Sequence, residues 1–342
     1  MDIAIIGGGW VGCHLAYQLK DEHNVTIYEK NSNLFSETSY NNQNRLHVGY
    51  HYARNQKTRK LCEDTFDRFI NDYGLFVKDV PRNYYCVPYS DSVIDFGTFK
   101  KIYHDYSFEE TRLPFLKSIE GSVQVNEKYI SFKDAQNFFN KHLSHLVVQE
   151  EISENTMMFL SYEYDLVLNC TNNFIRDIYC DSAFYELALT LVYEQTRDLP
   201  FDAITLVDGD FFSIYPYSGN LYSVSDVEFT PLRQVLSSEE LKNISISDTD
   251  VQLTKNNIEN KILKYFPDFN HFFKYHSFYT SVKSKYKNQS ADRYPVINGE
   301  SNIIHCFTGK IQGIYIIEDY VKEYIDGWEW SNRNHLTRTA QV

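Results

Sequence analysis

The start of the chain alternates short apolar runs with an amphipathic stretch, in the order of a β-α-β unit. Residues 3–6 are a β-type apolar run, and a glycine-rich turn follows them. Apolar residues then recur at helical spacing as far as Leu19. A second β-type run, residues 25–28, ends on Glu29. The pattern predicts strand, turn, helix and strand in direct succession.

The middle of the chain switches between polar turns, helical periods and strand-like runs. Residues 31–44 are polar and turn-rich, and an amphipathic helix is predicted over 58–73, with Gly74 as its stop. Residues 76–93 have β-like runs, which suggests entry into a second lobe. The pattern then predicts a helix over 134–143, strands over 146–152 and 156–162, and a buried parallel strand over 164–171.

The second half is dominated by β-type runs. Residues 187–194, 203–207, 211–217 and 221–224 predict an antiparallel sheet, with 218–220 as a hairpin turn. A helix is predicted over 256–266. Residues 293–324 then predict a strand, a glycine turn and a helix, and residues 331–342 form a polar, loose tail.

The turn after the first strand carries the most specific chemistry, Gly7-x-Gly9-x-x-Gly12. Gly7 permits a tight turn, Gly9 lets backbone approach a pyrophosphate, and Gly12 lets the helix lie close on the strand. The helix N-terminus favours the phosphate charge. Glu29 lies at the position that accepts hydrogen bonds from ribose hydroxyls. The arrangement predicts a dinucleotide site.

Composition narrows the class of protein. The chain has 342 residues, is 43% hydrophobic and 23% charged, and carries a net charge of −13. These values fit a globular enzyme of two lobes and argue against a nucleic-acid surface. No apolar stretch is long enough for a membrane span. Six cysteines without a Cys-x-x-Cys pair, and an N-terminus unlike a signal peptide, favour a reduced, cytoplasmic compartment.

Four blocks together resemble the FAD-dependent oxidoreductases of the D-amino-acid oxidase family, which includes glycine and sarcosine oxidases. The blocks are the opening unit through Glu29, the segment 39–52 with Leu46-His47-Val48-Gly49-Tyr50-His51-Tyr52, the strand 165–171, and residues 293–313 with Thr308-Gly309-Lys310-Ile311-Gln312-Gly313. They occur in the family's order. Three positions depart from its motifs: Asn172 replaces a glycine, Lys310 a histidine, and Ile311 a glycine.

The resemblance implies an α/β fold, in which a Rossmann-like FAD-binding domain of the glutathione-reductase type is interleaved with an α+β substrate domain built on an antiparallel sheet. Residues 1–75, 128–175 and 290–330 are expected to form the FAD-binding domain, and 76–127 and 176–289 the substrate domain. FAD is the expected cofactor and a small molecule the expected substrate. The sequence leaves the oligomeric state, the electron acceptor and any covalent flavin link open.

The resemblance also assigns roles to particular residues. Arg45 and Arg293 are candidate anchors for an acid group, His47 a candidate base, and Lys310 a candidate positive charge near the flavin. In each case a purely structural role stays open, and His47 bonded beside the cofactor is an equal alternative. The candidate cofactor-binding residues are Gly7, Gly9, Trp10, Val11, Gly12, Glu29, Lys30, Asn44, Arg45, Thr171, Gly309, Lys310, Ile311 and Gly313.

The implied reaction is hydride transfer from a C–N or C–O bond of a small amino acid, hydroxy acid or sugar-like substrate to flavin N5. An alternative is a non-redox flavin-dependent lyase or mutase that tailors a nucleotide or sugar. An NAD-dependent dehydrogenase shares the glycine motif, but the segment 39–52 and the terminal glycine loop argue against it. A non-catalytic binding protein is the remaining alternative.

Overall fold

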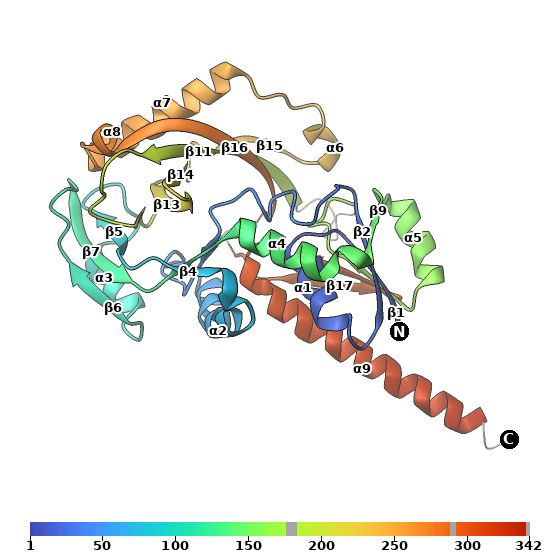
Figure 1. Cartoon of the computed structure of the whole chain (residues 1–342). Helices are drawn as coiled ribbons and strands as arrows, with labels where there is room; N and C mark the ends of the chain where they lie inside the picture. The colour runs from blue at the N-terminus through green and yellow to red at the C-terminus, as the bar shows by residue number, and fades with distance from the viewer. Residues whose placement is uncertain (176–182, 288–291, 340–342) are drawn as a thin grey trace. The chain divides into compact units, whose positions relative to one another are not determined.

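The computed structural model describes residues 1–175, 183–287 and 292–339, with side chains to residue 328. The chain divides into two compact units, each made from separate stretches of sequence (Figure 1). Unit 1 is Met1–Leu34, Phe139–Ile178 and Arg293–Val342, and unit 2 is Phe35–Phe138 and Tyr179–Asp292. Residues 35–75 and 128–138, which the sequence analysis assigns to the FAD-binding domain, pack with unit 2. The assignment of ligand roles to these stretches stays a prediction.

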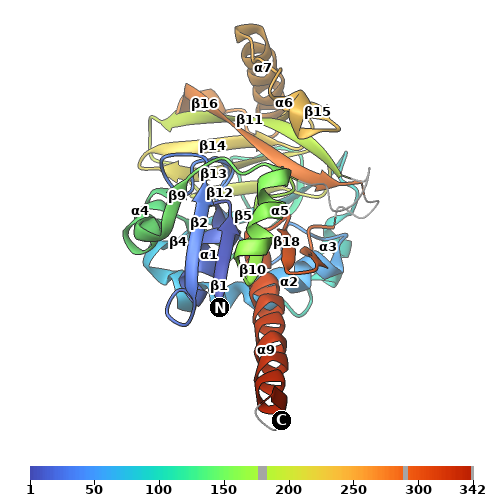
Figure 2. The same ribbon diagram turned by 90° about the vertical axis from the view of Figure 1, so that its right-hand side faces the viewer.

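Unit 1 is built on a six-stranded sheet in the order β17-β18-β10-β1-β2-β9, parallel except for the edge strand β17. Its strands are β1 (Asp2–Ile6), β2 (Asn24–Glu29), β9 (Val147–Gln149), β10 (Leu166–Asn169), β17 (Val296–Glu300) and β18 (Ile303–Phe307). Its helices are α1 (Trp10–Leu19), α5 (Glu154–Glu163) and α9 (Ile314–Thr339), with η2 (Ser144–Leu146) and η3 (Ile311–Gly313) as short 3₁₀ turns. Figure 2 shows α1 beside β1 and β2, and α9 running toward the C-terminus.

The carboxyl ends of the parallel strands β2, β1, β10 and β18 meet at one edge of this sheet, because their registers align in one direction. The turn after β1, Glu29 at the end of β2, the loop after β10 and the loop after β18 all leave from this edge. Ligands of open α/β sheets bind outside the carboxyl ends of their strands. The fold therefore brings three of the predicted blocks to one edge of unit 1.

Unit 2 contains a nine-stranded sheet, ordered β15-β11-β14-β13-β12-β5-β7-β6, with β16 also paired to β11. Every pair is antiparallel except β12 with β5. The strands are β5 (Asn83–Pro88), β6 (Phe108–Thr111), β7 (Ile119–Val125), β11 (Ala183–Gln195), β12 (Ala203–Leu206), β13 (Phe212–Ser218), β14 (Leu221–Asp226), β15 (Pro231–Val235) and β16 (Phe273–Tyr286). A second sheet joins β3 (Arg45–Leu46), β8 (Lys128–Ile130) and β4 (Val77–Asp79).

The two faces of the large sheet differ in polarity. One face packs Leu191, Ile214 and Val224 against Ile258 and Ile262 of α7 (Asp248–Tyr265), which Figure 1 shows lying along the sheet. The other face carries hydroxyl groups at Thr205, Ser213 and Ser225, because successive residues of a strand point to opposite faces. The other helical elements of unit 2 are α2 (Gln56–Tyr73), η1 (Gly74–Phe76), α3 (Phe96–Ile102), α6 (Ser238–Leu241) and α8 (Phe269–Phe272), and α4 (Phe132–Leu143) spans the boundary between the units.

Most predicted elements are present and the predicted fold class is confirmed, but two predictions are wrong. Residues 156–162 belong to helix α5 and are not a strand: Ser153 caps the helix by accepting from Thr156 N, and Met157 and Leu160, three residues apart, face the core. The predicted loose tail after residue 330 is instead helical, because α9 continues to Thr339. Residues 340–342 and Cys180 lie outside the described residues.

Candidate functional site

The turn between β1 and α1 depends on two glycines that have no room for a side chain. Gly7 has φ +103°, and a β-carbon there would lie 2.9 Å from the carbonyl oxygen of Cys170 at the end of β10. A β-carbon on Gly12 would lie 1.9 Å from the carbonyl oxygen of Gly7. The first turn of α1 therefore lies directly against the glycine turn, as the sequence predicts.

Within the described residues, helix α1 begins without a side-chain cap. Its N-cap residue is Gly9, in an extended conformation. By contrast α2, α3, α5 and α7 each begin with a side chain that accepts a backbone N–H: Asn55, Asp95, Ser153 and Ser247. The first N–H groups of a helix need acceptors, and a phosphate supplies them. Trp10 and Val11 are the first two residues of this helix, and Trp10 packs edge-on against Phe139.

Glu29 is held beside the glycine turn. Its side chain is buried, with Oε2 accepting from Gly8 N at 2.6 Å and Oε1 from Asn31 N at 2.9 Å. Each carboxylate oxygen has a second lone pair, so these bonds orient the group without using up its capacity to accept from ribose hydroxyls. Lys30, the next residue, is exposed.

Polar side chains at the end of β10 and in the loop after it are joined by hydrogen bonds. Asn169 contacts His305 of β18 through Nδ2 and Nδ1 at 2.9 Å, and its Oδ1 accepts from Thr171 Oγ1 at 2.7 Å. Asn172 has φ +57°, a left-handed conformation that glycine and asparagine tolerate best. This explains the departure from the family's glycine: the backbone needs φ > 0, and asparagine supplies it.

The loop after β18 brings two candidate residues together. Thr308 fixes the loop by donating Oγ1–H to Lys310 O at 2.6 Å and accepting from Lys310 N at 3.2 Å. A β-carbon on Gly309 would lie 3.0 Å from the Arg293 side chain, so Arg293 packs on this loop. Ile311 and Gly313 form the 3₁₀ turn that leads into α9. Arg293 and Lys310, two separate candidates in the sequence, are thus neighbours in unit 1.

In unit 2, Arg45 is buried on the polar face of the large sheet. Its Nη2 donates to Tyr85 Oη at 2.7 Å and to Thr205 Oγ1 at 2.9 Å, and its guanidinium lies 4.6 Å from the centre of the Tyr215 ring. Its Nε is buried and has no hydrogen-bond partner among the residues that the structure describes. A buried unpaired donor is costly, so Nε is a place where an acceptor of a ligand would be favoured.

His47 is buried two residues further on and bonds to Glu127. The distance from His47 Nδ1 to Glu127 Oε2 is 3.2 Å, and Glu127 is fully buried. His51 stacks on His47 with ring centres 5.6 Å apart, and Tyr52 packs edge-on against it. His51 and Tyr52 therefore pack around His47.

The ionisation of this cluster follows from burial and charge. Burial raises the pKa of the Tyr85 phenol well above its usual value; the Arg45 cation opposes this effect and Glu127 adds to it. For Arg45, burial lowers the pKa, but Tyr85, Tyr215 and Glu127 more than compensate, so the guanidinium pKa is raised. Tyr85 is thus a neutral hydroxyl donor and Arg45 a fixed cation.

A row of hydroxyl groups crosses the polar face of the sheet and was not foreseen. Tyr85, Thr205, Ser213 and Ser225 occupy paired positions on β5, β12, β13 and β14; we call them the hydroxyl row. Arg45 bonds to the first two, and Gln43 Oε1 accepts from the last two at 2.9 Å each. The row therefore anchors the segment from Gln43 to Arg45. The alternation of Thr205 and Ser213 with apolar neighbours in the sequence could have predicted the hydroxyl row. No pattern near Glu127 in the sequence indicates its role.

Asn44 adopts φ +51° and is buried, and its backbone N–H donates to Asn42 Oδ1. These bonds hold a turn before β3. Tyr215 and Tyr222 are buried in unit 2. Whether Asn44 also contacts a cofactor stays a prediction.

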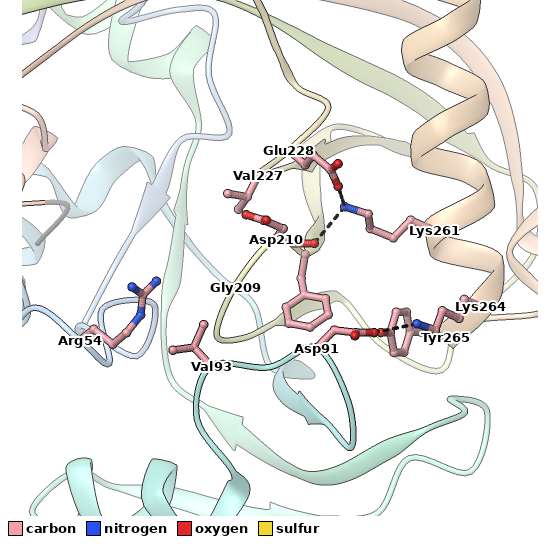
Figure 3. A pocket seen from close by; sticks show the side chains of 11 residues that line it. Arg54, Asp91, Val93, Gly209, Asp210, Val227, Glu228, Lys261, Lys264 and Tyr265 are labelled. Carbon is pink, nitrogen blue, oxygen red and sulfur yellow. Dashed lines mark hydrogen bonds and ion pairs between the residues drawn. The ribbon is translucent and has the colours of Figure 1, made fainter. Parts of the chain in front are cut away.

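A surface pocket of about 430 Å³ in unit 2 is lined with charged side chains (Figure 3). Its lysines are already paired: Lys261 bonds to Asp226 and Glu228, and Lys264 to Asp91. Arg54 pairs with Asp208. Because its cations are neutralised by the protein, the pocket is a weaker candidate for an anionic ligand than Arg45.

Within the part of the chain that the structure describes, no helix is long and apolar enough to cross a membrane. Among the same residues, no group of His, Cys, Asp or Glu side chains is arranged to hold a metal ion.

The parallel sheet, glycine turn, uncapped helix and terminal carboxylate of unit 1 define a dinucleotide-binding α/β protein. The family model described as "FAD dependent oxidoreductase" (DAO) matches residues 2–105. The FAD-dependent monooxygenase FPY4 of Fusarium mangiferae is 30% identical over 338 residues, which cover 95% of this chain and 91% of that protein. The chain belongs to the DAO family of FAD-dependent oxidoreductases.

Other comparisons agree with this assignment. The FAD-dependent monooxygenase kojA of Aspergillus flavus is 25% identical, over 95% of this chain and 85% of that protein. The structure of glycine oxidase from Geobacillus kaustophilus matches with a TM-score of 0.70 at 12% identity, over 95% of this chain and 94% of that chain. L-α-glycerophosphate oxidase from Mycoplasma pneumoniae, solved with FAD bound, gives a TM-score of 0.68 at 13% identity, over 93% and 92%. The resemblance deduced from the sequence, and FAD as the cofactor, are confirmed.

Proposed function

We propose that the protein oxidises a C–N or C–O bond of a small amino acid, hydroxy acid or sugar-like substrate. The observation that supports this is a buried guanidinium, Arg45, two residues from a buried imidazole, His47, within the stretch that the DAO family model matches. A fixed cation suits an acid or other electron-rich group of a substrate, and an imidazole suits removal of a proton.

Unit 1 has the features that FAD requires. The uncapped N-terminus of α1, the glycine turn and Glu29 would hold its pyrophosphate and ribose, and Thr171, Gly309, Ile311 and Gly313 belong to the loops at the same sheet edge. Bound FAD supplies the hydride acceptor at N5. Lys310 would place a positive charge where negative charge develops, and Arg293, packed on the same loop, is a second candidate anchor.

The test is anaerobic bleaching of the flavin, screened against amino acids, N-methyl amino acids, 2-hydroxy acids and nucleotide sugars. We expect one class to bleach the wild-type protein. Arg45→Ala should then raise KM at least tenfold if Arg45 anchors the substrate, and Arg293→Ala tests the second anchor in the same way. Unchanged kinetics in both variants would remove both residues from the site.

A second candidate is monooxygenation, which the name of the relative at 30% identity favours. The two activities differ in their need for reductant. An oxidase or dehydrogenase is bleached by substrate alone, whereas a monooxygenase needs an external reductant and incorporates oxygen from ¹⁸O₂ into its product. A non-redox lyase or mutase would turn over substrate with neither net bleaching nor oxygen incorporation.

A further inference from the structure

We propose that Glu127 is a positioning residue that holds His47 as the tautomer protonated on Nδ1, so that Nε2 carries the basic lone pair. Glu127 lies in the short connection between β7 and β8, 80 positions along the chain from His47. It is fully buried, as His47 nearly is, so water does not compete for the bond between them. Nothing about the family motif in residues 46–52 indicates this partner.

The two oxygens of the Glu127 carboxylate have different tasks. Oε1 accepts from the backbone N–H groups of Val48 at 2.9 Å and Gly49 at 3.1 Å. Oε2 accepts from Tyr85 Oη at 2.6 Å and lies 3.2 Å from His47 Nδ1. The backbone bonds fix the carboxylate against the segment that carries His47. Since a carboxylate only accepts, the nitrogen that faces Oε2 must carry the proton.

The hydrogen bonds of Glu127 continue from His47 to Arg45. Arg45 and Tyr85 share a hydrogen bond, and Tyr85 also bonds to Glu127, so one buried cation and one buried anion are linked through a neutral phenol. A neutral ring with hydrogen on Nδ1 has an acceptor at Nε2. That nitrogen is the one that can take a proton from a substrate.

The tautomer is measured directly on the FAD-loaded protein labelled with ¹⁵N-histidine. Long-range ¹H–¹⁵N correlation spectra separate protonated ring nitrogens from unprotonated ones, and His47→Asn identifies the His47 signals by their loss. We expect Nδ1 protonated and Nε2 unprotonated in the wild type. A doubly protonated ring, or a proton on Nε2, would overturn the proposal.

Glu127→Gln is the sharpest variant, because the two oxygens are used differently. The glutamine carbonyl can keep the bonds from Val48 and Gly49, and its NH₂ then takes the place of Oε2. An amide donor facing Nδ1 requires the lone pair there, so we expect the proton of His47 to move to Nε2. Tyr85→Phe is the matched control: it removes the other bond to Oε2 but leaves the His47 contact, and the wild-type tautomer should persist. An unchanged tautomer in Glu127→Gln contradicts the proposal.

The functional consequence rests on the proposed role of His47 as a base. With a substrate from the bleaching screen, Glu127→Gln should lower kcat about 100-fold, the range for loss of general base catalysis, with KM changed less than threefold. Reversal of the tautomer with unchanged kcat would retain the positioning role and reject His47 as the base. Loss of kcat without reversal would reject Glu127 as the group that sets the tautomer.

Discussion

At the scale of single residues, the sequence indicates a residue's role when the groups it acts with are close to it in the chain. Gly7, Gly12 and Glu29 could be interpreted because their tasks are set by the order of neighbouring elements. Glu127 could not, because its partner His47 is remote in sequence and no motif links them. Arg45 and His47 were found as candidates by resemblance, but the partners that bury and orient them come from the tertiary structure.

Gly12→Ala should abolish FAD loading, because the added methyl group would lie 1.9 Å from the Gly7 carbonyl oxygen, a backbone atom that has no rotamer to escape into. Helix α1 would have to move off the turn, at a cost of about 1–3 kcal/mol in the free energy of unfolding. Flavin absorbance per mole of protein and urea denaturation measure the two effects.

Gly74→Ala is the matched control for this change. A β-carbon on Gly74 would have no atom of the described residues within 4 Å, beyond its own neighbours in the chain, and its φ of −55° suits alanine. We expect full FAD loading and a free energy of unfolding that is unchanged or higher by up to about 1 kcal/mol. If both variants lose flavin equally, the close approach of α1 to the glycine turn is not what FAD loading requires.

At the scale of elements, the sequence predicted those whose pattern is strong and local. The first strand, α1, β2, α2 and β10 were found where periodicity and turn residues agree. The error at residues 156–162 arose because their apolar run suits a strand as well as a helix; the cap at Ser153 decides for the helix. Strand β16 was missed, since its alternation of Lys, Tyr and Ser gives no apolar run, and its pairing with β11 comes from distant residues.

The ion pair between Arg82 and Asp202, in the connection that leads into β12, allows a test of how charge contributes to the free energy of unfolding. Arg82 bonds to Asp202 through Nη2 at 2.7 Å and Nε at 3.3 Å, and its backbone N donates to the same carboxylate. Burial raises the pKa of Asp202, but the bonds from Arg82 outweigh it, so the carboxyl pKa lies below its usual value of 3.8. A carboxyl whose pKa is lower in the folded state stabilises the fold above the unfolded pKa and stops doing so as pH falls through the folded pKa.

Asp202→Asn should therefore lower the free energy of unfolding by about 1 kcal/mol at pH 7, since both side chains are partly exposed. The difference from wild type should shrink as pH falls below 3.8 and vanish below the folded-state pKa. Urea denaturation at a series of pH values measures it. Asp198→Asn, which removes an exposed charge from the same loop, is the matched control for the change in net charge. A difference that persists at low pH would assign the effect to side-chain shape instead of charge.

At the scale of the whole molecule, both units are assembled from stretches far apart in the chain. Unit 1 needs the first residues for its glycine turn and the last for β17, β18 and α9. The order of the family blocks along the chain predicts this arrangement, and no local pattern does. Contacts between α1 and α9 should therefore contribute strongly to the free energy of unfolding of unit 1, although the two helices lie near opposite ends of the chain.

The contact that joins these helices is buried. His14 Nε2 of α1 lies 2.9 Å from Glu318 Oε2 of α9, with both side chains almost fully buried, and Lys322 Nζ contacts Glu318 Oε1 at 2.6 Å from a half-exposed position. Glu318→Ala removes the buried acceptor and should lower the free energy of unfolding by about 3 kcal/mol, with a loss of FAD loading. Lys322→Ala removes only the exposed partner and should cost less than about 1 kcal/mol. Urea denaturation followed by flavin fluorescence measures both. If the two variants lose equal stability, the buried His14 contact is not what joins the ends of the chain in unit 1, and packing of α9 must carry that task.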